Sequence, residues 1–264
     1  MRSKFLSILA IAVALIAGEL QAEEVVFDNF DGGNGTFTTF GGGDGFPQSR
    51  AAVGDDFDTI AAPNSGDWLV NSVDFRMLAI AETPGTLSVY SGIQVTVSIL
   101  DLGADSVLAP TAANPLNGEY TAGEFATAPV LGAETFDLGT IGTLAGGNGL
   151  FVNQSVDFTN SINIGNGIGT GISFQFSDAT GASEAGNLSV AYRNNGLPAP
   201  LVGITSDRNY RDSTGDGNVS GGFNFTSDIG LAFSVNATAT AVPEPTSLAV
   251  LGVLGLGFVT RRRR

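Results

Sequence analysis

Apolar and polar residues alternate along many short segments of this chain, and this period of two constrains the fold more than any other feature of the sequence. Between residues 93 and 99 the odd positions hold Ile or Val, whereas the even positions hold Gln, Thr or Ser. This pattern predicts a β-strand with one face on a core and the other in water. The other segments that we expect to form strands are residues 25–30, 36–40, 69–77, 151–158, 172–176, 188–192, 223–225 and 231–235.

Glycine-rich turns separate these segments at short intervals. The chain has 37 glycines among 264 residues, and they lack the three-residue period of collagen. The clearest turn sequences stand at residues 32–35, 41–45, 63–66, 146–149 and 215–218. Helix is expected only as a turn or two near residues 77–82, and residues 104–129 are expected to form a long surface loop.

The predicted fold is therefore all-β, a single antiparallel β-sandwich with glycine-rich loops, and a jelly roll is its expected form at this length. A β-solenoid is the alternative, but no repeat of about 20 residues supports it. One face of residues 69–77 is expected to carry Leu69, Val73, Phe75 and Met77, with Asn71 interrupting it. The single tryptophan, Trp68, is expected to pack in the core or at its rim.

The chain has no cysteine and no histidine. This excludes disulfide bonds, thiolate and imidazole metal ligands, and every mechanism that needs a histidine base. We therefore predict that the protein is not an enzyme. Glycoside hydrolysis is the catalytic alternative that stays open, because two carboxylates suffice for it. Asp74 and Asp157, however, each stand alone on their predicted strands.

The first 22 residues have the three parts of a secretory signal peptide. Arg2 and Lys4 precede an apolar run at residues 5–17, and Ala22 is the small residue before the expected cut. The run is too short to span a bilayer permanently. We therefore expect export through the Sec translocon.

The last 23 residues combine a short apolar run with a basic end. Residues 248–259 would reach only about 18 Å as a helix, against about 30 Å for the hydrocarbon core of a bilayer. The four arginines that follow resist translocation and stay on the cytoplasmic side. Such a segment is expected to anchor the protein in the inner membrane only until it is processed.

These C-terminal features resemble the PEP-CTERM sorting signal that exosortases recognise. The resemblance covers residues 242–264 only, and the residues that carry it are Pro243, Glu244, Pro245, Arg261, Arg262, Arg263 and Arg264. It implies a bacterium that makes exopolysaccharide, cleavage near Pro243 to Pro245 by an exosortase-type membrane protease, and release to the cell surface or extracellular matrix. Cargo domains of this family are diverse, so the resemblance implies no particular activity for the rest of the chain.

The body between the two signals, residues 23–241, is strongly acidic. It carries 24 carboxylates and five arginines but no lysine, which is a net charge of −19. This charge repels phosphate backbones, so we expect no nucleic acid among the partners. Solubility alone is enough to explain such a charge.

Residues 212–218 match the first half of an EF-hand calcium loop, with oxygen-bearing side chains at loop positions one, three and five and glycine at position six. The second half departs from that pattern, because Phe223 stands where a bidentate glutamate is needed. The sequence therefore favours a hairpin loop of turn-forming residues without metal, and a calcium site is the alternative. If calcium binds here, the expected ligands are Asp212 and Asp216, with help from Asp207 or Asn218.

A second acidic cluster consists of Asp55, Asp56 and Asp58, with Asp44 upstream. Carboxylates this close repel one another, and a divalent cation would relieve the repulsion. The more common outcome is a loop in which water solvates the charges. We therefore expect an exposed acidic loop here, with a divalent-cation site as the alternative.

Two Tyr-Arg pairs suggest an alternative function as a carbohydrate-binding module. Tyrosine rings stack on sugars, and arginines donate hydrogen bonds to them. The candidate residues are Tyr192, Arg193, Tyr210 and Arg211, and further aromatic candidates are Trp68, Tyr90 and Tyr120.

The sequence thus favours an exported, non-enzymatic protein of the cell surface or extracellular matrix that is associated with exopolysaccharide. The alternatives are a carbohydrate-binding module, a glycoside hydrolase, and an adhesin that polymerises through exposed strand edges.

Overall fold

The computed structural model describes residues 22–30, 37–38, 52–63, 66–79, 87–103, 120–142, 150–167, 169–177, 188–193, 201–203, 205, 208–211, 221–224 and 230–240. These parts of the chain contain one short helix, α2, and the strands β1 to β13. The bounds are β1 Glu24–Asp28, β2 Phe37–Thr38, β3 Ala52–Phe57, β4 Trp68–Ala79, β5 Val89–Asp101, α2 Ala122–Thr127, β6 Val130–Gly142, β7 Leu150–Asn163, β8 Thr170–Ser177, β9 Leu188–Val190, β10 Tyr192–Arg193, β11 Arg208–Arg211, β12 Gly221–Asn224 and β13 Phe233–Ala239.

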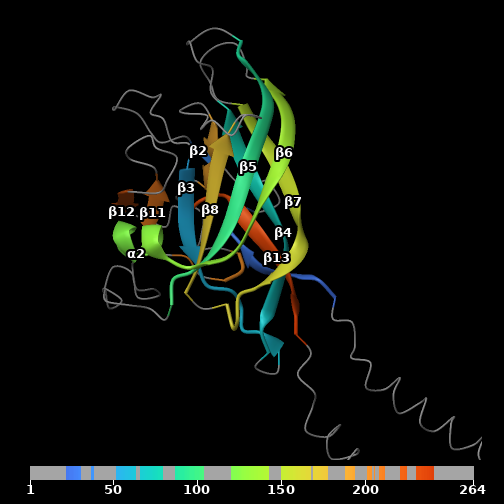
Figure 1. Ribbon diagram of the computed structural model, residues 1–264, viewed down its shortest axis with the longest axis vertical. Helices are drawn as coiled ribbons and strands as arrows, with labels where there is room; N and C mark the ends of the chain where they lie inside the picture. The colour runs from blue at the N-terminus through green and yellow to red at the C-terminus, as the bar shows by residue number, and fades with distance from the viewer. Residues whose placement is uncertain are drawn as a thin grey trace, which may run out of the picture.

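Most of the strands belong to two sheets that lie face to face (Figure 1). The five-stranded sheet has the order β1-β13-β4-β7, and β9 also pairs with β4. The six-stranded sheet has the order β12-β11-β3-β8-β5-β6, and β2 and β10 form a separate pair. Every one of these pairings is antiparallel. The predicted antiparallel, all-β sandwich is therefore confirmed.

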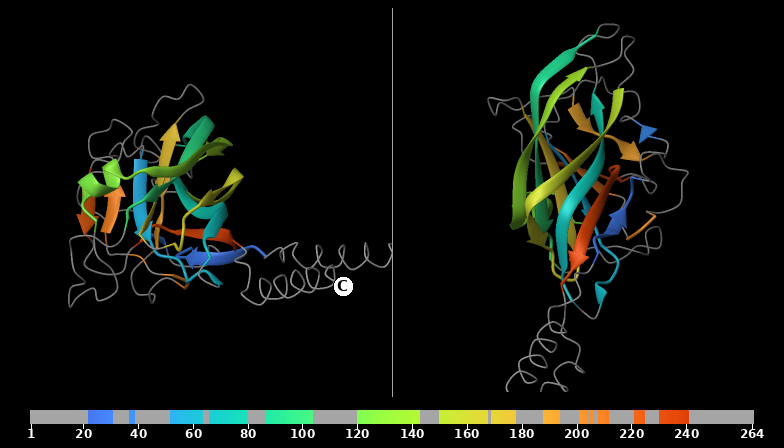
Figure 2. Two further views of the ribbon diagram at one scale, coloured as in Figure 1. Left: turned by 60° about the horizontal axis from the view of Figure 1, so that its bottom comes forward. Right: turned by 90° about the vertical axis from the view of Figure 1, so that its right-hand side faces the viewer.

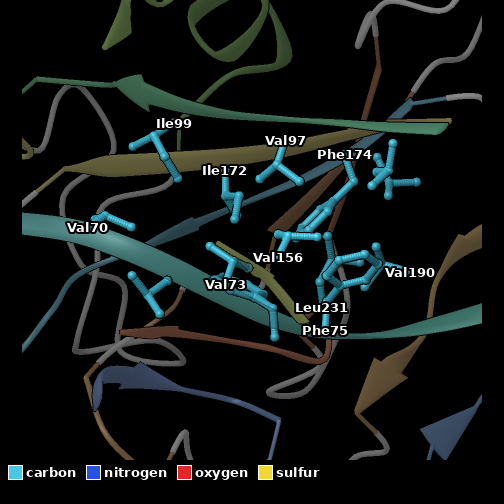
Figure 3. Packing of buried hydrophobic residues seen from close by; sticks show 14 of the residues in the cluster. Val70, Val73, Phe75, Val97, Ile99, Val156, Ile172, Phe174, Val190 and Leu231 are labelled. Carbon is cyan, nitrogen blue, oxygen red and sulfur yellow. The ribbon is translucent and has the colours of Figure 1, made fainter. Parts of the chain in front are cut away.

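The main core fills the space between the two sheets, where side chains of β4 point toward those of β5 and β8 (Figure 3). Rings of Phe75 and Phe174 lie 4.9 Å apart between their centroids, and Phe174 also contacts Phe233. Trp68 is fully buried, and its Nε1 donates a hydrogen bond to the Ile60 carbonyl, so its predicted place in the core is confirmed. The other predicted core positions that are buried include Ile93, Val95, Val97, Ile99, Ile172, Phe176, Leu188, Val190, Leu231 and Val235.

A β-bulge near Asn71 of β4 overturns one prediction about this core. The register between β4 and β7 shifts between Val70 and Ser72. A bulge adds one residue to a strand, so the faces of the residues before it are reversed relative to those after it. Val70 therefore faces the core together with Val73, whereas Leu69, which was expected on that face, lies half-buried on the other one.

Helix α2 lies beside β11 and β12, at one side of the six-stranded sheet (Figure 1). It begins with a capping box, in which the Thr121 and Glu124 side chains each accept a hydrogen bond from the backbone N–H of the other residue. Phe125 stacks on Tyr210 with ring centroids 4.0 Å apart, and both belong to a second, small core. The helix therefore covers β3 and β11 from outside.

Two sequence expectations about helix and loop are wrong for the described residues. The expected long loop at residues 104–129 contains α2, because Phe125 finds an apolar partner that the local sequence does not reveal. The expected helical turn near residues 77–82 is strand as far as Ala79, because both β7 and β9 pair with that end of β4.

The first and last strands of the body are neighbours. β1 pairs with β13 (Figure 2). In this pairing Glu24 lies opposite Ala237. The chain therefore enters and leaves the five-stranded sheet at adjacent points.

Candidate functional site

Three polar side chains with strong hydrogen-bonding capacity lie buried near the start of β13. Asn29, Asp55 and Arg193 are 3%, 0% and 4% exposed. Asp55 stands between Val53 and Phe57 on the face of β3 that points into the main core. We call this group the buried polar cluster.

The backbone of Leu231 links the members of the buried polar cluster. Its N–H donates to Asp55 Oδ2 at 2.7 Å, and its carbonyl accepts a hydrogen bond from Asn29 Nδ2 at 2.8 Å. A Cβ on Gly230 would lie 2.6 Å from Asn29 Nδ2 and 3.1 Å from Asp55 Oδ2, so only glycine leaves room for both side chains. On the side to which the N–H and carbonyl of Leu231 point, no described strand pairs with the segment before β13. Side chains therefore hold the segment there.

The environment of Asp55 favours its protonated form. Burial raises the pKa of the Asp55 carboxyl well above its ordinary value, and the nearby charge of Asp56 raises it further. Hydrogen bonds from the backbone N–H groups of Leu231 and Asp56 and from the Thr205 hydroxyl lower the pKa, but they offset the rise only in part.

Arg193 is the cationic member of the cluster. Its Nη1 donates to Asn29 Oδ1 at 3.2 Å, whereas its buried Nε has no hydrogen-bond partner among the described residues. The backbone of Arg193 is paired, because its N–H donates to the Gly230 carbonyl. A chain of hydrogen bonds thus runs from the guanidinium through Asn29 and the backbone of Leu231 to Asp55.

The acidic cluster around Asp55 is not the solvated loop that the sequence suggested. Asp55 and Asp56 are buried neighbours in β3, and successive side chains in a strand point to opposite faces. Asp58 accepts a hydrogen bond from the Gly169 N–H at 2.7 Å. The pairing of β3 with β8 and β11 draws these carboxylates into the sheet.

The tyrosines that were predicted to stack on sugars do not lie at the surface. The chain has one tryptophan and four tyrosines, and all five lie in described segments. Tyr192 and Tyr210 are buried, as is Arg193, while the side chain of Arg211 lies outside the described residues. Their rings fill the two cores because the strands that carry them pack there. The remaining aromatic candidates are buried as well, namely Trp68, Tyr90 and Tyr120.

The other predicted site residues lie outside the described residues. These are the calcium candidates Asp207, Asp212, Asp216 and Asn218 and the sorting residues Pro243, Glu244, Pro245, Arg261, Arg262, Arg263 and Arg264. Within the described segments, no group of three or more carboxylates is placed to hold a metal ion. The part of the chain that the structure describes also contains no helix with the length and apolar character to cross a membrane.

The outward faces of both sheets carry hydroxyl and amide side chains, with carboxylates such as Asp74 and Asp137 among them. On the six-stranded sheet, Thr96 lies opposite both Thr135 and Gln175, and the Oγ1 atoms of the two threonines are 2.8 Å apart. On the five-stranded sheet, Asn236 Nδ2 donates to Asp74 Oδ2 at 3.1 Å. These side chains present hydrogen-bonding groups that water or the hydroxyl groups of a polymer can satisfy.

Fold and cluster together define an antiparallel β-sandwich with a buried carboxyl group in its interior. No protein-family model matches the chain, and a comparison with curated proteins finds no similar sequence.

Sequence reasoning missed the buried polar cluster as a unit. A signal for Asp55 was present, because Val53 and Phe57 alternate with it and predict a core-facing strand position. Asn29 carried no such signal, since its partner Leu231 is 202 residues away in the chain.

Proposed function

We propose that this chain is an exported, non-enzymatic β-sandwich protein of the cell surface or extracellular matrix, processed by an exosortase and associated with exopolysaccharide. The observation that carries the proposal is the pairing of Glu24 with Ala237. The predicted signal-peptide cut after Ala22 and the predicted sorting motif from Pro243 flank this pair closely. Removing both signals would leave every described strand in place.

The surfaces of the body support a structural role for the protein. Its tyrosines and tryptophan are in the cores, and the described outer faces carry hydroxyl and amide side chains. A lysine-free body of this charge stays soluble, and neutral hydroxyl and amide groups suit contact with a hydrated polysaccharide. A hydrolase would need two carboxylates facing one groove, whereas the adjacent Asp55 and Asp56 point to opposite faces of β3.

The intact mass of the protein isolated from its native host tests the processing proposal. We expect a product that starts near Glu23 and ends near Pro243. A variant with Pro243 and Pro245 replaced by alanine should keep its C-terminal segment, whereas the same change at Pro198 and Pro200 should not affect processing. Released protein that keeps its arginine tail would contradict the proposal.

We further infer that the sandwich is a jelly roll. Its support is the strand order, in which β1-β13-β4-β7 faces β3-β8-β5-β6. Along these eight strands the chain changes sheet at every step except from β5 to β6. Such an arrangement is expected of two Greek keys wound into two sheets. An experimental structure in which these eight strands have other neighbours in the two sheets would refute this inference.

Calcium binding at residues 212–218 is a separate proposal, supported by the spacing of oxygen ligands. Calcium should raise the melting temperature of the protein relative to a chelator, and replacing Asp212 and Asp216 with asparagine should abolish the difference. Equal melting temperatures of the unaltered protein in calcium and in chelator would refute it.

A further inference from the structure

The two sheets of the sandwich approach each other along one side at the strands β6 and β7. Each of these strands ends its own sheet, β6 pairing with β5 and β7 with β4 (Figure 1). In the described part of the chain no backbone ladder joins β6 to β7, so each presents a long edge of 13 or 14 residues. Open edges of this length are sites where another strand can add.

Apolar side chains of β6 and β7 bridge this gap. The ring of Phe136 contacts that of Phe158 at 5.7 Å between centroids. Gly132 lies so close to Ile162 that an added Cβ would be 2.7 Å from its Cγ1. Between these two apolar contacts stands a charged residue, Glu134.

Glu134 points toward the core side of its strand. It lies opposite Val97, which is fully buried on the inner face of β5. Its Oε2 accepts a hydrogen bond from the Thr159 N–H at 2.8 Å, and its Oε1 accepts one from Thr159 Oγ1 at 2.5 Å. The hydrogen bonds from the hydroxyl and from the N–H of Thr159 lower the pKa of Glu134, so it stays ionised at neutral pH.

We propose that Glu134 is a guard residue that prevents β6 from pairing with the β6 of a second copy of this chain. An inward-pointing charge on an edge strand is tolerated while water reaches it, but pairing on that edge would bury it. The strand is otherwise suited to pair with itself. In an antiparallel pair centred on Thr135, Asp137 would face Ala133 of the second copy, and no two carboxylates would oppose each other.

Light scattering of the exported protein over a range of concentrations tests this proposal. E134T replaces the guard residue with a neutral, β-favouring residue. E134Q removes the charge but keeps the size of the side chain, so the E134Q variant is expected to fold even if E134T does not. D137N is the matched control, since it removes one charge from the outer face of the same strand and keeps an acceptor for the Gly139 N–H. We expect the unaltered protein and D137N to keep one molecular mass, and E134T and E134Q to self-associate with an initial mass increase of about twofold.

Hydrogen exchange then locates the new contact. Amide groups on the free edge of β6 should exchange more slowly in associated E134T or E134Q than in the unaltered protein. The proposal is wrong if both Glu134 variants keep the original mass, if D137N associates as they do, or if association leaves the exchange of β6 unchanged.

Discussion

Replacing Asp55 with alanine is expected to destabilise the protein by leaving a buried backbone donor without its acceptor. This donor is the N–H group of Leu231, which lies 2.7 Å from Asp55 Oδ2. A buried donor left unsatisfied costs about 1–3 kcal/mol. The free energy of unfolding of D55A should therefore be lower by roughly 1–3 kcal/mol at a pH where the carboxyl is protonated.

This loss should depend on pH, because burial raises the pKa of Asp55 in the folded protein. An aspartate in an unfolded chain titrates near about pH 3.9. Below that pH the carboxyl is protonated in both states, and its contribution to stability is complete. As the pH rises toward the folded pKa, the unfolded state releases its proton first, so the unaltered protein loses stability. D55A has no carboxyl at this position and lacks this loss. The difference in unfolding free energy between the two proteins should therefore shrink as the pH rises.

Urea unfolding of both proteins at about pH 4 and about pH 7 measures this difference. D157N is the control, because it also replaces an aspartate but at an exposed position, on β7. It should lower the free energy of unfolding at about pH 4 much less than D55A does. A penalty for D55A that grows between these pH values would show that folding favours the ionised carboxylate, and the reasoning would be refuted.

Two further predictions concern the cores. G54A should destabilise the protein by about 1–3 kcal/mol in thermal unfolding, because its Cβ would lie 2.5 Å from the ring of Phe125. G142A should be neutral, because nothing lies within 4 Å of the Cβ that it adds. Equal effects of the two substitutions would contradict this packing of Phe125 on Gly54. The fluorescence of the single Trp68 should be shielded from iodide in the folded protein and should become accessible on unfolding, since the indole is fully buried; efficient quenching of the folded protein would place Trp68 at the surface instead.

The long core strands were predictable because their burial is one-sided and regular. Residues 93–99 of β5 and residues 172–177 of β8 alternate strictly, so their local sequence already defines the face that meets the core. β6 escaped prediction because it is an edge strand with little buried surface, and Gly139, at a φ of 72°, stands where its pairing with β5 shifts register. β3 escaped because two aspartates interrupt its apolar residues.

The candidate site could be predicted only in part. The tyrosines and Arg193 were recognised as notable residues, but their surroundings were not, because burial depends on which strands cover them. The ring of Tyr210 is covered by Phe125, a residue 85 positions earlier in the chain. Contacts over such separations leave no periodic signal in the local sequence.

By itself, the sequence determined the strand periodicity and with it the antiparallel, all-β class, because the alternation of side chains along a strand is a local property. The two predicted terminal signals on which the proposed export rests also come from the sequence alone. Three features depend on the tertiary structure. β1 pairs with β13, the Asp55 carboxyl accepts a hydrogen bond from the Leu231 N–H inside the core, and Glu134 lies between the edges of the two sheets. Each of these depends on strands meeting across long stretches of chain, where pairing and desolvation outweigh the preference of any single residue.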